Sequence, residues 1–215
     1  MDRQRRVVRA LLDAHGRTYA DEAGIRLRDT PQPLYRLLVL AHLLSARIRA
    51  SVALATARAL HEAGLRDPHR MAEAGWQERV DALGRGGYRR YDERTATQLG
   101  EAAELLNERW GGDLRRLRRE ADGKVSELRH LLQEFPGIGP AGADIFLREA
   151  QGVWPEAAPY LDAKALQGAE RLNLPKDTER LAELADDTDP AVLAAALVRA
   201  AVDKDVAEDA LRRAG

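Results

Sequence analysis

The segment of the sequence with the clearest chemical potential combines glycine, proline and apolar residues in one order. It reads Phe135-Pro136-Gly137-Ile138-Gly139-Pro140-Ala141-Gly142. This order predicts a helix that ends near Phe135, a tight turn that the glycines permit, and a second helix that begins at Pro140 or Ala141. The backbone amides in the first turn of that second helix have no partner inside the helix, so they would point outward at a phosphate.

Two helices joined in this way form a helix–hairpin–helix motif, which would contact the backbone of a nucleic acid and therefore carry no sequence information. The residues predicted to hold the phosphate are Gly137, Ile138, Gly139, Ala141 and Gly142. Gly139 is expected to need a conformation, or a close backbone approach, that a side chain would block. The alternative is a glycine-rich turn between two core helices, but apolar flanks favour the motif: Leu132, Phe135, Ile145 and Phe146.

Arginines with tyrosines among them form a second group of candidates. Only four of the 34 basic residues are lysines, and residues 85–94 carry four arginines beside Tyr88 and Tyr91. The planar guanidinium group suits bidentate contact with phosphate. A GC-rich genome explains an excess of arginine equally well, and a solvated helix start explains the tyrosines. The formal net charge of −1 decides nothing about nucleic acid, since it hides an acidic tail from residue 176 onward.

The remaining polar residues give weaker signals. The five histidines are scattered without the spacing of metal ligands, and His42, on an apolar helical face, is predicted to be a buried core residue. No serine lies in a Gly-x-Ser-x-Gly segment. The chain has no cysteine, which excludes disulfides, zinc–cysteine sites and iron–sulfur clusters.

The spacing of apolar residues predicts the elements that must position these candidates, and it predicts helices from end to end. Proline or aspartate marks several helix starts, glycine marks several ends, and no stretch alternates as a strand would. An aromatic content of 5% also argues against a β-sandwich or barrel. The prediction is an all-α fold, with helices over 34–44, 52–60, a short one from Pro68, 76–83, 88–109, 124–134, 141–150, 163–172, 178–185, 190–201 and 204–213.

Length and hydropathy limit the class of protein. A chain of 215 residues allows one large or two small domains. No apolar run approaches the roughly 18 residues of a membrane-spanning helix. The N-terminus, Met1-Asp2-Arg3-Gln4-Arg5-Arg6, lacks the apolar core of a signal peptide. We therefore expect a soluble intracellular protein.

Further residues after the hairpin extend the pattern. A helix follows, then a break at Gly152, a single Asp162 before another helix, and Arg171-Leu172-Asn173-Leu174-Pro175. This order resembles the endonuclease III-like superfamily of helix–hairpin–helix DNA glycosylases. Upstream, Leu43-Leu44-Ser45-Ala46-Arg47 is similar to the Leu-Ser-Ala-Gln segment of that family, and Gly84 to Tyr88 is similar to its Gly-x-Tyr turn. The resemblance covers roughly residues 30–175 and is specific at the hairpin and the aspartate.

The resemblance implies two helical lobes with a cleft between them: residues 30–134, and residues 1–29 together with 135–215, the latter containing the hairpin (135–150) and Asp162. In that family the aspartate after the hairpin serves catalysis at the mouth between the lobes. A fixed carboxylate can stabilise the positive charge that develops on a sugar as an N-glycosidic bond breaks, and it can orient water. Asp162 is also a good N-cap for the helix that follows, and one residue can fill both roles.

Several positions depart from the family's pattern. Ala141 stands where bifunctional members carry a lysine nucleophile, so the implied enzyme is monofunctional. Arg47 replaces the glutamine that fills the gap left by a flipped base, and Gly87 replaces a wedge leucine. The family's Asp-Thr-His reads Asp162-Ala163-Lys164 here. The cluster-binding cysteines are missing, so no iron–sulfur cofactor is expected.

The sequence therefore favours a monofunctional DNA N-glycosylase that flips a damaged base of double-stranded DNA into the cleft. Arg47, Tyr88 and Arg89 are the further predicted DNA contacts, and Asp162 is the predicted catalytic residue. The resemblance implies no cofactor beyond a monovalent cation at the carbonyls of Phe135 and Ile138. We expect a monomer in the cytoplasm, at the nucleoid. Two alternatives stay open: a non-catalytic helix–hairpin–helix DNA-binding protein, which the changes at Arg47 and Gly87 favour, and a helical protein–protein interaction domain.

Overall fold

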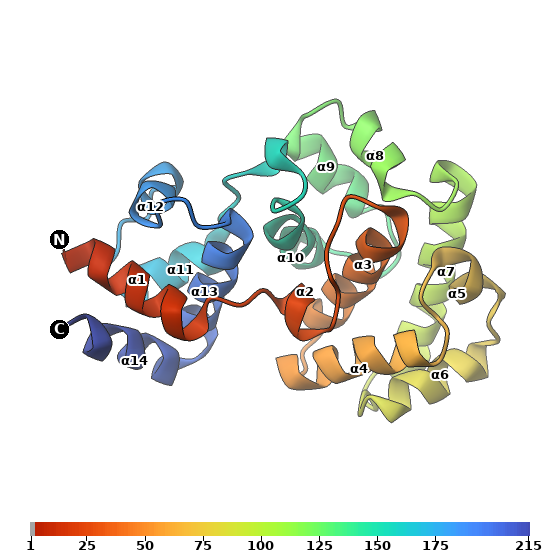
Figure 1. The fold of residues 1–215 in the computed structure, drawn as a ribbon. Coiled ribbons are helices and arrows are strands. Elements are labelled where there is room, and N and C mark those ends of the chain that lie inside the picture. The colour runs from red at the N-terminus through yellow and green to blue at the C-terminus, as the bar shows by residue number, and fades with distance from the viewer. Residues whose placement is uncertain (1–2) are drawn as a thin grey trace. The chain divides into compact units, whose positions relative to one another are not determined.

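The computed structural model describes residues 3–215, and within that range it contains helices and no strand (Figure 1). The predicted all-α fold class is confirmed. The helices are α1 (Arg3–His15), α2 (Tyr19–Glu22), α3 (Pro31–Ser45), α4 (Ala50–Glu62), α5 (Pro68–Glu73), α6 (Trp76–Arg85), α7 (Asp92–Trp110), α8 (Leu114–Glu120), α9 (Val125–Leu132), α10 (Pro140–Ala150), the 3₁₀ helix η1 (Pro155–Ala157), α11 (Ala163–Arg171), α12 (Thr178–Leu184), α13 (Pro190–Val202) and α14 (Lys204–Ala214).

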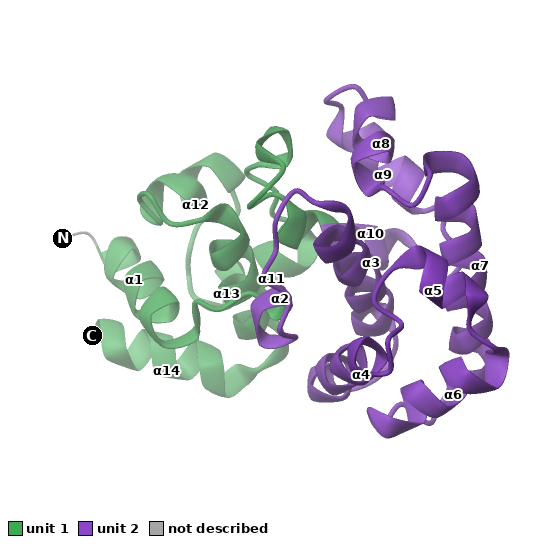
Figure 2. Cartoon of the chain, turned by 45° about the vertical axis from the view of Figure 1, so that its right-hand side comes forward, with its two compact units in different colours: residues 1–19, 147–215 green, residues 20–146 purple. Residues whose placement is uncertain are grey.

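Two compact units make up the chain (Figure 2). Unit 1 joins the N-terminal residues up to Tyr19 to residues 147–215, and unit 2 comprises residues 20–146. The boundaries thus lie after residues 19 and 146, whereas the sequence placed them after 29 and 134. The turn between α9 and α10 belongs to unit 2 because it packs against α3 and α7 of that unit. The predicted cleft between the lobes stays a prediction.

In unit 1, helix α13 lies at the centre of the packing, against α1, α11 and α14. Alanine and leucine fill most of its buried positions, so its neighbours approach closely. The closest approach is at Gly168 of α11. A Cβ atom built there would overlap the carbonyl oxygen of Leu197 and lie 2.7 Å from its carbonyl carbon. Glycine at this position allows the backbones of α11 and α13 to touch.

In unit 2, helix α3 is the most deeply buried element, with α4 and α8 packed against it. Helix α7 packs against α5, α6 and α8. Proline begins α3 at Pro31, and the carboxylate of Asp67 caps α5 by accepting a hydrogen bond from the amide of Arg70 at 2.9 Å. Helices α3 and α7 matter for function because they carry the residues that contact the turn between α9 and α10.

Two of the differences between the predicted and the observed helices have a clear physical cause. Helix α7 begins at Asp92 and not at 88, because Gly87 and Tyr91 have φ angles of +86° and +140°, which no helix accommodates. Helix α8 lies in a segment that apolar spacing left without an element, since arginine fills most of its length. None of the helices within residues 3–215 is both long and apolar enough to cross a membrane.

Candidate nucleic-acid interface

The turn between α9 and α10, with the first turn of α10, forms what we call the hairpin segment (residues 133–142). Inside it, the amide of Ile138 donates to the carbonyl of Phe135 at 2.9 Å, and the amide of Ala143 donates to the carbonyl of Gly139 at 3.0 Å. The amides of Gly139, Ala141 and Gly142 donate to no acceptor in the described part of the chain. Gly139 and Ala141 are exposed, so unpartnered donors stand at the helix start, where an anion is stabilised.

The glycine requirement of the turn lies at Gly137 and not at Gly139. Gly137 has a φ angle of +84°, and a Cβ atom there would lie 2.6 Å from Nε2 of His42 and 3.0 Å from Oε1 of Gln98. Gly139 has an ordinary φ angle and open space where its Cβ would be. The expected conformational need at Gly139 is therefore wrong. The other reason predicted for a glycine here, the close approach of a ligand to its backbone, stays a prediction.

His42 of α3 lies directly under this turn. Its side chain is 6% exposed, and burial lowers its pKa to about 4, against the opposing effect of a hydrogen bond with Gln98 of α7. The imidazole is therefore neutral at neutral pH. The sequence correctly predicts His42 as a buried core histidine. It gives no sign of the contact with Gly137, because the two residues are far apart along the chain and meet only in the folded unit.

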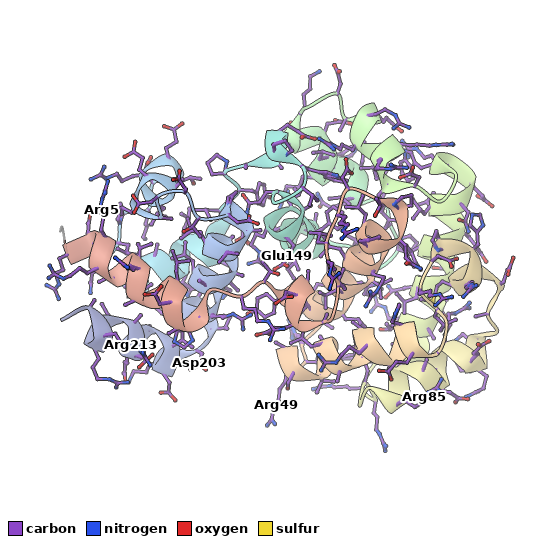
Figure 3. All side chains as sticks on the ribbon, viewed as in Figure 1. Arg5, Arg49, Arg85, Glu149, Asp203 and Arg213 are labelled. Carbon is purple, nitrogen blue, oxygen red and sulfur yellow. The ribbon has the colours of Figure 1, made fainter. Side chains whose placement is uncertain are left out.

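The C-terminal end of α3 supports the start of α10. A Cβ atom at Gly142 would lie 3.7 Å from Cβ of Ser45, whose hydroxyl donates to the carbonyl of His42 at 2.7 Å. The loop that follows, residues 46–49, carries the exposed side chains of Arg47 and Arg49. Arg49 extends away from the ribbon at the start of α4 (Figure 3). Arg47, predicted from the sequence, thus follows directly on the helix end that packs against the hairpin segment.

The start of α7 supplies a second basic region in unit 2. Arg89, Arg90 and Arg94 are exposed, and the positive charge of Arg94 acts on His42. Arg89 is therefore available for the predicted contact with DNA. Tyr88 is not, because its side chain is 2% exposed and its hydroxyl shares a 3.0 Å hydrogen bond with Thr95. The prediction that Tyr88 contacts DNA is wrong.

Ile138 in the hairpin segment and Asp144, which follows it in α10, have structural roles in unit 2. The side chain of Ile138 is buried, and its amide is used inside the turn, so it anchors the segment. Asp144 of α10 pairs with Arg129 of α9, with Nε–Oδ1 at 2.7 Å, which ties the two helices together. No group of three or more metal-ligating side chains occurs among residues 3–215.

Asp162 belongs to unit 1 and caps α11. Its Oδ1 accepts hydrogen bonds from the amide of Ala165 at 3.2 Å and from Nη1 of Arg148 at 3.3 Å. The predicted N-cap role is confirmed by the first of these bonds. Oδ2 accepts no hydrogen bond in the described structure, and the side chain is 12% exposed. Asp162 is thus a carboxylate with one oxygen fixed by the protein and one available for other chemistry.

Arg148 is the partner that the sequence did not indicate. It lies in the last turn of α10 and is 8% exposed, so its guanidinium group needs a counter-charge that Asp162 supplies. Lys164, the amine nearest to Asp162 in sequence, is exposed and donates to Oε1 of Gln167 at 2.9 Å. Ala141, which stands where bifunctional members of the resembled family carry a lysine nucleophile, is exposed.

Comparison with known proteins identifies the fold. No family model matches the sequence, and no curated protein matches it. A solved structure described as "Structure of a Trapped Endonuclease III-DNA Covalent Intermediate: Estranged-Adenine Complex" superposes with a TM-score of 0.51. It is 16% identical in sequence, and the match covers 93% of this chain and 85% of that chain. A likeness at this identity concerns the fold: the chain has an endonuclease III-like helical fold.

Proposed function

We propose that this protein is a DNA N-glycosylase-like protein of base-excision repair, monofunctional, which holds a phosphate of double-stranded DNA with its hairpin segment. The observation that carries the proposal is the set of unpartnered amides of Gly139, Ala141 and Gly142, with the exposed Arg47 two residues after Ser45, which packs against Gly142. Amides at a helix start bind phosphate without reading bases. The solved structure with the same fold is an endonuclease III–DNA covalent intermediate, which supports DNA as the partner.

The chemistry assigned to unit 1 is cleavage of the N-glycosidic bond of an extruded nucleotide. As this bond breaks, the leaving base takes up a proton and positive charge develops on the sugar. The free Oδ2 of Asp162 would stabilise that charge and orient the water whose hydroxyl ends on the sugar carbon. Arg148 and the amide of Ala165 would hold the carboxylate in place. With Ala141 in the hairpin helix, no lysine is placed there to attack the sugar.

The partners and the cation follow from the same proposal. The carbonyl oxygens of Phe135 and Ile138 are the atoms that would hold a monovalent cation. The first has one lone pair left beside the amide of Ile138, and the second accepts no backbone amide among the described residues. A bound cation would add positive charge near the phosphate. We infer that this protein acts as a monomer on chromosomal DNA, in the cytoplasm at the nucleoid.

One observation favours a second function, that of a non-catalytic DNA-binding protein. The ion pair with Arg148 already neutralises part of the charge of Asp162, and a neutralised carboxylate stabilises a cationic sugar less well. Arg47 also stands where the family's gap-filling glutamine would be. Such a protein would keep the hairpin segment and its affinity for DNA while leaving bases intact.

A glycosylase screen separates these functions. Duplexes that carry alkylated, oxidised or deaminated bases are incubated with the protein and then treated with alkali, which reveals silent abasic sites. We expect strand breaks only after alkali, and no covalent adduct when borohydride is added to the reaction. Binding without breaks would support the non-catalytic function. An adduct would show that another amine attacks the sugar, with Lys164 tested first, and the enzyme would not be monofunctional.

Replacement of Gly139 by lysine is expected to weaken binding of any duplex about tenfold or more, although it adds a positive charge. The side chain has room in the free protein, so the fold should persist, but it would keep a phosphate away from the amides. Affinities measured over a range of salt should show a log–log slope that is smaller by about 0.9 for each phosphate that the variant no longer neutralises. The control is Gly84→Lys, at another open glycine, where affinity should not fall.

Two results would count against this prediction. If the folded Gly139→Lys protein binds duplex as well as the wild type does, the hairpin segment does not bind the DNA backbone. If the wild-type protein shows no duplex affinity that responds to salt, a helical protein–protein interaction domain becomes the better description of the chain.

A further inference from the structure

Three elements of unit 2 meet at one buried polar side chain, His42. It comes from α3, Gly137 comes from the hairpin segment, and Gln98 comes from α7. The positions are tight: a Cβ atom on Gly137 would lie 2.6 Å from Nε2 of His42 and 3.0 Å from Oε1 of Gln98. His42 and Gln98 also share a hydrogen bond. The turn therefore packs directly against the imidazole ring.

An apolar residue would fill this space at a smaller cost in desolvation free energy, so the presence of histidine here points to a role beyond filling space. Burial of a polar ring costs free energy unless the ring is hydrogen-bonded, and Gln98 supplies that bond. Because the bond orients the plane of the ring, it also defines the surface that Gly137 contacts. Leucine at this position could form no hydrogen bond to α7 that would orient its side chain.

The same helix supports the hairpin segment at a second point. One turn beyond His42, the Cβ of Ser45 lies against Gly142, and the Ser45 hydroxyl donates to the carbonyl of His42. Thus α3 contacts both the turn, at Gly137, and the start of α10, at Gly142. The unpartnered amides of Gly139 and Ala141 lie between these two supports in the chain.

We propose that His42 is a positioning residue: held by Gln98, it sets the path of the turn so that the amides of Gly139, Ala141 and Gly142 converge on one phosphate oxygen group. This inference rests on the proposed DNA-binding function and adds to it the residue that orients the phosphate site. His42 would not touch the phosphate itself, because its side chain is buried under Gly137 and the turn would separate the two.

Replacement of His42 by leucine tests the proposal. The variant keeps the buried volume but loses the bond to Gln98. Its affinity for a short undamaged duplex should fall about tenfold, which is the effect expected when the displaced turn loses one hydrogen bond to the charged phosphate. The matched control is His61→Leu, which removes a histidine from α4, and it should leave affinity unchanged. Thermal unfolding of both variants reports whether the fold is intact.

Two readouts separate positioning from a merely structural role. First, Gly139→Lys should weaken binding in the wild type but add little in the His42→Leu background, because both changes remove the same contact. Second, the backbone amide resonances of Gly139, Ala141 and Gly142 should shift when duplex is added to the wild type, and should shift much less in His42→Leu. If His42 has only a structural role, Gly139→Lys should weaken binding by the same factor in both backgrounds. The three amide resonances of His42→Leu should then shift on addition of duplex as they do in the wild type.

A second variant covers the case in which His42→Leu does not fold. Gln98→Leu removes the same hydrogen bond from a partly exposed position, and the same loss of affinity is expected. If either folded variant binds duplex with the affinity, salt slope and amide shifts of the wild type, the positioning role is overturned while DNA binding stands. If the wild type itself binds no duplex, the proposed function fails, and this inference fails with it.

Discussion

Replacement of Asp162 by asparagine should lower glycosylase turnover about a hundredfold or more, the usual cost of removing one group that stabilises transition-state charge. The reason is that the two carboxylate oxygens have different partners. Both hydrogen bonds from the protein reach Oδ1, and Oδ2 accepts none in the described structure. An asparagine oxygen can take the place of Oδ1 and keep both bonds. Only the negative charge and the free oxygen are then removed.

The control for this change is Asp177→Asn, in the same unit. Asp177 caps α12 by accepting a hydrogen bond from the amide of Arg180 at 2.7 Å, so the variant repeats the change of cap without touching the candidate site. Its turnover should equal that of the wild type. Turnover of Asp162→Asn is measured on the duplex that gives the strongest signal, with duplex affinity measured beside it. Unchanged turnover would leave Asp162 as a helix cap and ion-pair partner only.

The alanine variant of Asp162 reports the structural role of the same residue. Loss of an N-cap alone costs about 1 kcal/mol. Asp162→Ala would also leave the guanidinium group of Arg148, which is 8% exposed, with neither a counter-charge nor a hydrogen-bond acceptor, and removal of one partner from a buried pair costs about 3 kcal/mol. Asparagine keeps the acceptor. Chemical denaturation should therefore show a clearly larger loss of stability for alanine than for asparagine.

The second large effect is expected at Gly168, where alanine should destabilise unit 1 by about 3 kcal/mol or more, because overpacking against backbone cannot be relieved by a side-chain rotation. The added methyl group would overlap the carbonyl oxygen of Leu197. Relief requires α11 and α13 to separate, and these two helices hold the core of unit 1 together. Because α11 begins just after Asp162, separation of the helices would also disturb the candidate carboxylate.

Gly84→Ala is the matched control for this prediction. Gly84 also lies inside a helix, α6, but a Cβ atom there meets nothing within 4 Å. Alanine is the better helix former, so the free energy of unfolding of this variant should rise by about 0.5–1 kcal/mol. Thermal or chemical unfolding of both variants measures the contrast. Equal stability of Gly168→Ala and the wild type would show that α11 and α13 do not pack as closely as described.

The fold class could be predicted from the sequence because helices depend on residues close together in the chain. Asp67 caps α5 through an amide three residues away, and Asp162 caps α11 in the same way. The capping aspartates, the prolines and the spacing of leucines are visible without any tertiary information. The start of α7 was predicted too early because apolar spacing does not report the positive φ angles of Gly87 and Tyr91.

The candidate site could be predicted only in part. The turn and its phosphate-binding amides follow from local order, since proline and glycine stop one helix and free the start of the next. Which glycine the turn requires did not follow, because the side chain that blocks a Cβ at Gly137 comes from α3. The burial of Tyr88 did not follow either, because Thr95 and the packing of unit 2 remove that ring from solvent.

The sequence by itself thus determined the helices, their caps and the turn with its free amides, all of which arise from contacts within a few residues. Tertiary structure decided what surrounds those elements: His42 under Gly137, Gln98 holding His42, and Arg148 on Asp162. The physical reason is one of range. Local propensities act along the chain and can be read from it, whereas burial and ion pairing depend on which distant segments the fold brings together.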